Sequence, residues 1–100
     1  MFTIITPTYK RSDHLKRTIL SVRKQTCTDY RMIIVNDSPE DTSYSAIEDM
    51  CKNDPKITYL VNEKNMGVNF TRNRALSEAG DDTWIIFLDD DDYLAEDTLA

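Results

Sequence analysis

The sequence of 100 residues is poor in the residues that interrupt or cross-link a chain, with two glycines, three prolines and two cysteines. Because 40% of the residues are hydrophobic and 30% are charged, this composition excludes a disordered, low-complexity chain. It indicates one small globular domain or half of a larger one. Cys27 and Cys51 form no CxxC motif, so we expect them to be reduced, buried and inert thiols.

Long hydrophobic runs are also missing, so we expect no membrane span within residues 1–100. The first apolar segment is too short for a signal peptide and leads directly into Pro7. The cytoplasm is therefore the simplest compartment, with the inner face of the membrane as an option for a longer protein. The net charge of −6 argues against general affinity for nucleic acid.

The charges are unevenly distributed along the chain. Residues 81–100 contain eight of the eighteen acidic residues and no Lys or Arg, whereas residues 1–31 contain seven of the twelve basic residues. An acidic edge that faces a basic segment is compatible with a site for a metal ion and a multiply charged anion.

Four short hydrophobic segments rich in β-branched residues predict strands at residues 2–6, 32–35, 57–61 and 84–88. Pro7 is predicted to end the first strand because it has no N–H group to donate. Amphipathic patterns between the strands predict helices that lie at about residues 13–25, 43–52 and 68–79. The hydrophobic face of the third helix is expected to contain Phe70, Ala75, Leu76 and Ala79.

Strands that alternate with helices, and that are hydrophobic throughout, predict the α/β class, with a parallel sheet covered by helices on both faces. The strand at residues 84–88 is expected to be buried on both faces. In open sheets of this kind, ligands bind beyond the carboxyl ends of the strands, where the strand order reverses. We therefore expect the functional residues directly after each strand.

Polar residues follow each predicted strand, and the most conspicuous are four consecutive carboxylates at residues 89–92. Because adjacent like charges repel, four acids at the end of a buried strand are typical of a site for a hard divalent cation such as Mg²⁺. A solvated acidic turn before a helix is the alternative interpretation. Asp37, after the second strand, has a similar alternative as the cap of a turn.

Four segments together resemble the nucleotide-binding half of family 2 glycosyltransferases with the GT-A fold. They are residues 4–11 (IITPTYKR), 33–38 (IIVNDS), 65–73 (NMG followed by RN) and 87–92 (FLDDDD). They occur in the family's order with similar spacing and cover essentially the whole chain. The resemblance implies the Rossmann-like fold of nucleotide-diphospho-sugar transferases, and we expect the strand order 3-2-1-4.

The resemblance also implies roles for single residues. Asp37 would hydrogen-bond the base, typically uracil, and Asp89 would lie near the ribose. Asp91 would bind the Mg²⁺ or Mn²⁺ that bridges the diphosphate, with Asp89 as the other acid of the Asp-x-Asp motif. Asp90 and Asp92 have the same spacing one residue later, so this register stays an alternative.

The nucleotide-binding residues expected on this basis are Thr6, Pro7, Thr8, Tyr9, Asp37, Asn65, Gly67, Arg72, Asp89 and Asp90. Arg74 is expected on the solvated face of the third helix.

The implied reaction is transfer of a sugar, with inversion, from a nucleotide-sugar to the hydroxyl of a saccharide or lipid-linked acceptor in polysaccharide biosynthesis. The expected donor is a UDP-sugar and the expected cofactor is Mg²⁺ or Mn²⁺. The general base and the acceptor-binding half are expected beyond residue 100, so residues 1–100 should bind donor and metal without transferring sugar alone. A non-catalytic nucleotide-binding or interaction module and an Asp-dependent phosphoryl-transfer domain stay open as alternatives.

Overall fold

The computed structural model describes residues 2–25, 29–80 and 83–90. The described chain contains four strands: β1 (Phe2–Thr8), β2 (Tyr30–Asn36), β3 (Ile57–Val61) and β4 (Trp84–Phe87). They form one parallel sheet in the order β3-β2-β1-β4. The predicted fold class and the predicted strand order are both confirmed.

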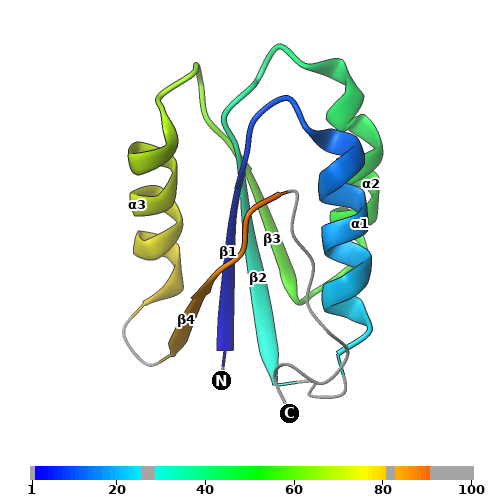
Figure 1. The fold of residues 1–100 in the computed structure, drawn as a ribbon, viewed down its shortest axis with the longest axis vertical. Helices are drawn as coiled ribbons and strands as arrows, with labels where there is room; N and C mark the ends of the chain where they lie inside the picture. Colours follow the sequence, from blue (N-terminus) through cyan, green and yellow to red (C-terminus); the bar gives the residue numbers. More distant parts are fainter. Residues whose placement is uncertain (1, 26–28, 81–82, 91–100) are drawn as a thin grey trace.

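Helices cover both faces of the sheet, as Figure 1 shows. One face carries α1 (Ser12–Arg23) and α2 (Ser45–Lys52), the second preceded by the short 3₁₀ helix η1 (Thr42–Tyr44). Among the described residues, the opposite face carries one helix, α3 (Val68–Ala79). This arrangement follows from the strands, because successive side chains of a strand point to opposite faces of the sheet.

The alternation is visible in the two hydrophobic clusters of the core. Ile4 and Ile34 belong to the cluster that contains the buried residues of α1 and α2. Ile5 and Ile33, one residue away from them in sequence, pack with the alanines of α3. Strands that are hydrophobic throughout therefore serve two cores at once.

The strand β1 extends further than predicted, because Pro7 does not end it. Leu88 N donates to Ile5 O on the β4 side of β1, whereas Asp37 N donates to Thr8 O on the β2 side. Residues with odd numbers in β1 therefore direct their backbone groups toward β4, whose pairing with β1 ends at Ile5. The N–H group that Pro7 lacks would point to this side, so no ladder bond is lost.

The buried face of α3 differs from the predicted one. Thr71, Ala75 and Ala79, which are spaced four residues apart, are buried against the sheet. Phe70 and Leu76 were expected on this face but are 46% and 37% exposed. The buried positions hold small side chains, which allow α3 to lie close to β1 and β2, so the face cannot be identified by its largest hydrophobic residues.

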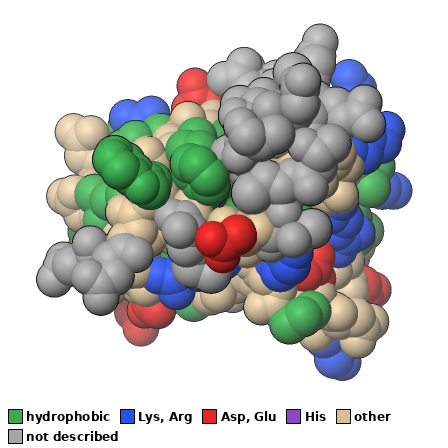
Figure 2. Space-filling view, turned by 90° about the horizontal axis from the view of Figure 1, so that it is seen from below, with side chains coloured by type: hydrophobic (Ala, Val, Ile, Leu, Met, Phe, Trp, Pro, Cys, Tyr) green, Lys and Arg blue, Asp and Glu red, His purple; other side chains and the backbone are tan. Residues whose placement is uncertain are grey.

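The strand β4 is more exposed than predicted. It pairs with β1 over residues 2–5, and its other edge has no partner strand among the described residues. Trp84 and Phe87 are 74% and 51% exposed, so the expectation of a strand buried on both faces is wrong for the described part of the chain. Figure 2 looks at the end of the molecule where the strands begin, and hydrophobic side chains gather at the surface there.

Candidate nucleotide-binding site

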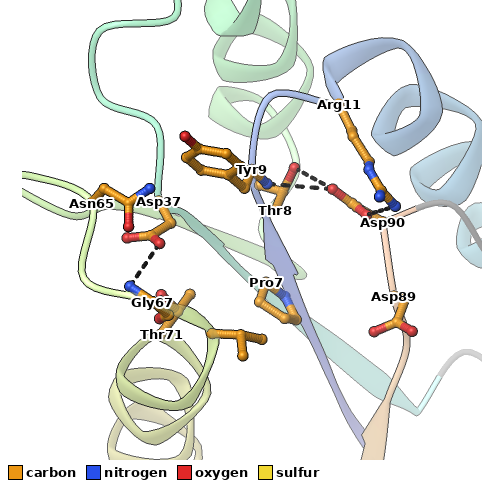
Figure 3. Close-up of a pocket in the computed structure, with 11 residues that line it drawn as sticks. Pro7, Thr8, Tyr9, Arg11, Asp37, Asn65, Gly67, Thr71, Asp89 and Asp90 are labelled. Carbon is orange, nitrogen blue, oxygen red and sulfur yellow. Dashed lines mark hydrogen bonds and ion pairs between the residues drawn. The ribbon is translucent and has the colours of Figure 1, made fainter.

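A pocket of about 480 Å³ lies at the carboxyl ends of the strands, bordered by the start of α3. Figure 3 shows its lining residues, which come from the ends of β1 and β2, from the β3–α3 loop and from the residues after β4. Eight of the ten expected nucleotide-binding residues line it, namely Pro7, Thr8, Tyr9, Asp37, Asn65, Gly67, Asp89 and Asp90. The strand-end segments therefore meet at one place, as parallel sheets of this kind require.

The other expected residues lie elsewhere. Thr6 is fully buried within β1, and its Oγ1 atom has no hydrogen-bond partner among the described residues. Arg72 does not line the pocket, but its Nη2 atom lies 3.5 Å from Asp89 Oδ1 at the rim. Asp91, the expected metal ligand, and Asp92, its alternative, lie outside the described residues.

Asp37 connects the end of β2 to the loop that precedes α3. Its Oδ1 atom accepts hydrogen bonds from Asn62 Nδ2 at 2.8 Å and from Met66 N at 2.7 Å. Its Oδ2 atom accepts from Gly67 N at 3.0 Å. Gly67 has a φ of 89°, a conformation that favours glycine, and this shape directs the loop amides toward the carboxylate. The carboxylate thus links two segments that are far apart in the sequence.

Asp90 connects the end of β4 to the loop between β1 and α1. Its Oδ2 atom accepts from Thr8 Oγ1 at 3.0 Å and from Tyr9 N at 3.4 Å, and Arg11 Nη1 lies 3.5 Å from Oδ1. Its backbone oxygen accepts from Thr18 Oγ1 at 3.1 Å. The side chain is 9% exposed. This carboxylate therefore satisfies donors within the protein, and it holds the ends of β1 and β4 together.

Asp89 differs from Asp90 although the two residues are adjacent. Its side chain is 58% exposed and lines the pocket, and its ion pair with Arg72 lies at the surface. The Arg72 guanidinium also lies 5.8 Å from the centre of the Phe87 ring. Both acids line the pocket, but Asp89 is exposed there whereas the carboxylate of Asp90 is enclosed by its protein partners.

The acidic residues of the described chain do not form a complete metal site by themselves. No group of three or more His, Cys, Asp or Glu side chains in residues 2–25, 29–80 and 83–90 has the arrangement to hold a metal ion. Asp89 is a hard oxygen donor that faces the pocket, and Mg²⁺ is commonly held by one or two carboxylates together with substrate phosphates. The described residues are thus compatible with a divalent cation that is shared with a phosphate ligand.

The groups with raised pKa values lie away from the pocket lining. Burial raises the pKa of the Cys51 thiol to about 11, which agrees with an inert thiol. Burial also raises the pKa of Tyr59 to about 12, against the opposing effect of the hydrogen bond from Asn36. Cys27 lies outside the described residues.

Three lining residues were not expected from the sequence: Arg11, Val68 and Thr71. Arg11 belongs to the segment 4–11, which follows the first strand. Its positive charge, expected to face the acidic end of the fourth strand, was the signal that could have identified it. Arg74 was expected to be solvated, but its Nη1 atom donates to Val61 O at 2.9 Å and to Asn62 Oδ1 at 2.8 Å. No local sequence signal distinguishes this arginine from its solvated neighbours.

Comparison with known proteins identifies the family. Residues 3–100 match the model of glycosyl transferase family 2. The chain belongs to this family. A GalNAc(5)-diNAcBac-PP-undecaprenol beta-1,3-glucosyltransferase of Campylobacter jejuni is 31% identical over 99 residues, which are 98% of this chain and 32% of that protein.

Solved structures of glycosyltransferases share the fold. The chain superposes on S. aureus TarS in complex with UDP-GlcNAc with a TM-score of 0.85 and 29% identity, covering 98% of this chain and 28% of that one. The mannosyltransferase PcManGT from Pyrobaculum calidifontis, in complex with GDP-Man and Mn²⁺, gives a TM-score of 0.85 at 23% identity and covers 98% of this chain and 30% of that one. The chain thus spans about a third of the length of these relatives. Within the described residues, no helix is long and apolar enough to cross a membrane.

Proposed function

We propose that this chain is the donor-binding part of a glycosyltransferase that moves a sugar from a UDP-sugar to an acceptor hydroxyl with inversion. The observation that carries the proposal is that the strand-end segments of a family 2 glycosyltransferase meet at one pocket. The TarS structure, which contains UDP-GlcNAc, supports UDP as the nucleotide.

The side of the pocket next to α3 would hold the nucleoside. Asp37 lines this side, and its Oδ2 atom accepts one hydrogen bond from the described residues. A carboxylate oxygen has two lone pairs, so Oδ2 can accept a second bond from a base N–H group such as that of uracil. Tyr9, which is 43% exposed, offers an aromatic ring beside the same space.

The opposite side would hold the diphosphate. Asp89 faces this space, whereas the carboxylate of Asp90 binds Thr8 and Arg11. We therefore favour Asp89 and Asp91 over Asp90 and Asp92 as the metal-binding pair. Bound Mg²⁺ or Mn²⁺ would supply a Lewis acid that stabilises the leaving nucleoside diphosphate. Arg72, at the rim, would add a guanidinium that suits phosphate oxygens.

The remaining parts of the reaction would lie beyond residue 100. We place there the carboxylate that deprotonates the acceptor hydroxyl and the residues that bind the acceptor. The name of the Campylobacter jejuni relative describes an undecaprenol-linked acceptor. A saccharide or lipid-linked acceptor in polysaccharide biosynthesis, at the cytoplasmic face of the membrane, is accordingly our proposal for the longer protein.

Calorimetric titration of UDP, GDP and dTDP into the chain, with Mn²⁺ present, tests the proposal. We expect saturable binding that is tightest for UDP, and no multiple turnover of a UDP-sugar by residues 1–100. A chain that is folded by circular dichroism but binds none of the three nucleotides would contradict the proposal and favour an interaction module. Turnover of p-nitrophenyl phosphate or acetyl phosphate would favour phosphoryl transfer instead.

A further inference from the structure

A chain of hydrogen bonds runs from α3 to the pocket and passes through the buried side chain of Asn62. Asn62, directly after β3, is 2% exposed, and its backbone N–H donates to Asn36 O. Its side-chain oxygen accepts from Arg74, and its side-chain Nδ2 group donates to Asp37 Oδ1 at 2.8 Å and to Thr71 Oγ1 at 3.0 Å. Every polar atom of this side chain therefore has a partner within the protein.

The partners determine which way the Asn62 amide points. An arginine guanidinium has donors only, so the group that faces Arg74 must be the amide oxygen. The amide nitrogen is then directed to Asp37, which as a carboxylate accepts only. Arg74 has its own position fixed by a second bond, because the same Nη1 atom donates to Val61 O. The direction of the bonds thus leads from the guanidinium to the carboxylate without ambiguity.

The same bonds determine which part of Asp37 remains for a ligand. Oδ1 accepts from both Asn62 and Met66, whereas Oδ2 accepts from Gly67. The carboxylate plane is therefore held by three donors, and Oδ2 keeps the larger acceptor capacity. If Asn62 were released, the carboxylate would lose one of these three donors and with it part of its fixed orientation.

Thr71 extends the network to the floor of the pocket. Its Oγ1 atom accepts from Asn62 and donates to Gly67 O at 2.7 Å, and Thr71 itself lines the pocket. Asn62 therefore contacts both elements of the wall next to α3, the carboxylate of Asp37 and the first turn of the helix.

We propose that Arg74 and Asn62 are positioning residues that act through Asp37 to orient the nucleotide-binding carboxylate. This inference rests on the proposed function, because it assigns Asp37 to the nucleotide. Neither Arg74 nor Asn62 lines the pocket, so their effect on a nucleotide must pass through Asp37, Thr71 and the loop before α3.

The chain offers a matched control for the structural role of an arginine. Arg31 donates to Thr3 Oγ1 at 3.2 Å and to the backbone oxygens of Glu78 and Ala79, at the other end of α3. Arg31 and Arg74 thus both connect α3 to the sheet, but among the described contacts only Arg74 is linked to Asp37, through the side chain of Asn62. Arg74→Met and Arg31→Met can therefore be compared directly.

The test combines UDP titration in the presence of Mn²⁺ with urea unfolding and amide hydrogen exchange. We expect Arg74→Met to weaken UDP binding about tenfold, because a misdirected Asp37 carboxylate would lose its hydrogen bond to the base, and tenfold is the effect of about one such bond to a charged group. Arg31→Met should lower stability and keep the wild-type affinity. Arg74→Lys should restore most of the affinity, because one ammonium group can make both bonds that Nη1 makes. Equal affinities in Arg74→Met and Arg31→Met would overturn the proposal.

Hydrogen exchange separates this proposal from the proposed function. Arg74→Met should speed exchange of the Met66 and Gly67 amides, which donate to Asp37, whereas Arg31→Met should leave both unchanged. This result in a protein that binds no nucleotide would support the positioning of Asp37 while the proposed function fails. Unchanged exchange at both amides in Arg74→Met would overturn the positioning itself.

Discussion

The two faces of the sheet are built by different means. On the face of α1 and α2, twelve buried residues of the described chain form one cluster that includes Leu15, Ile19 and Tyr44. On the face of α3, the corresponding cluster has five residues, and the helix contributes two alanines to it. The second face therefore buries less apolar volume, but it contains buried hydrogen bonds that connect Asp37, Asn62 and Thr71.

This difference indicates that the two faces contribute differently to stability and to ligand binding. Burial of large aliphatic side chains supplies most of the stability of a small domain. A network of satisfied polar groups adds little net stability, but it holds the side chains at a ligand site in fixed orientations. We therefore expect substitutions in the aliphatic cluster under α1 and α2 to change stability alone, and substitutions in the polar network under α3 to change nucleotide binding as well.

The largest expected effect on stability comes from Ile19→Ala. Ile19 is fully buried on α1, so the substitution removes apolar contacts and leaves a cavity, at a cost of about 3 kcal/mol. Urea unfolding measures the loss. The UDP affinity of the folded fraction should equal that of the wild type. A tenfold weaker affinity would contradict the idea that this face contributes to stability but not to nucleotide binding.

Asp37→Ala should have a smaller effect on stability and the largest effect on binding. The substitution leaves the amides of Met66 and Gly67 without their acceptor, which costs about 2 kcal/mol. Calorimetry should show at least a tenfold loss of UDP affinity. Asp41→Ala is the control, because Asp41 caps η1 through Ser43 and does not line the pocket. Equal UDP binding by both variants would remove Asp37 from the nucleotide site.

The face of α1 and α2 should also show a loss of stability at alkaline pH. Burial raises the pKa of Cys51 to about 11, whereas an unfolded thiol has a pKa of about 8.5. Below about pH 8.5 the thiol is protonated in both the folded and the unfolded state, so its ionisation does not reduce the free energy of unfolding. Above that pH the unfolded state releases its proton first, so the free energy of unfolding falls until about pH 11.

The pH effect can be measured by urea unfolding between pH 7 and 11. One group contributes a slope of at most about 1.4 kcal/mol per pH unit. Cys51→Ala should flatten the fall just above pH 8.5, and the pKa of about 12 for Tyr59 leaves a further decline above pH 10 in both proteins. An identical profile for the variant and the wild type would show that the thiol is not desolvated.

The sequence was sufficient to predict the fold and the place of the pocket. The strand segments and the polar residues that follow them can be recognised locally in the sequence. The rules for parallel sheets then predict that these polar residues lie together at one edge of the sheet. Asp37, Gly67 and Asp89 were therefore predicted at this edge of the sheet, and they line the pocket there. The sequence was not sufficient where the outcome depends on pairing between distant segments.

Three examples show this dependence. Asp89 and Asp90 are chemically identical neighbours, and only the pairing of β4 with β1 determines which one meets Thr8. Pro7 remains in β1 because the bond that it cannot donate would face β4 beyond the last paired residue. Phe70 is exposed because α3 packs through small residues, which a search for large hydrophobic side chains overlooks.

The most direct test of the account compares Mn²⁺-dependent UDP binding by the wild type, Asp89→Ala and Asp90→Ala. Asp89 is exposed and its ion pair lies at the surface, so Asp89→Ala should change stability by less than about 1 kcal/mol. We predict that this variant loses the gain in UDP affinity that Mn²⁺ gives the wild type. Asp90→Ala should instead lower stability, because Thr8 and Arg11 lose their acceptor. An Asp89→Ala protein that keeps the full Mn²⁺-dependent gain would contradict the account.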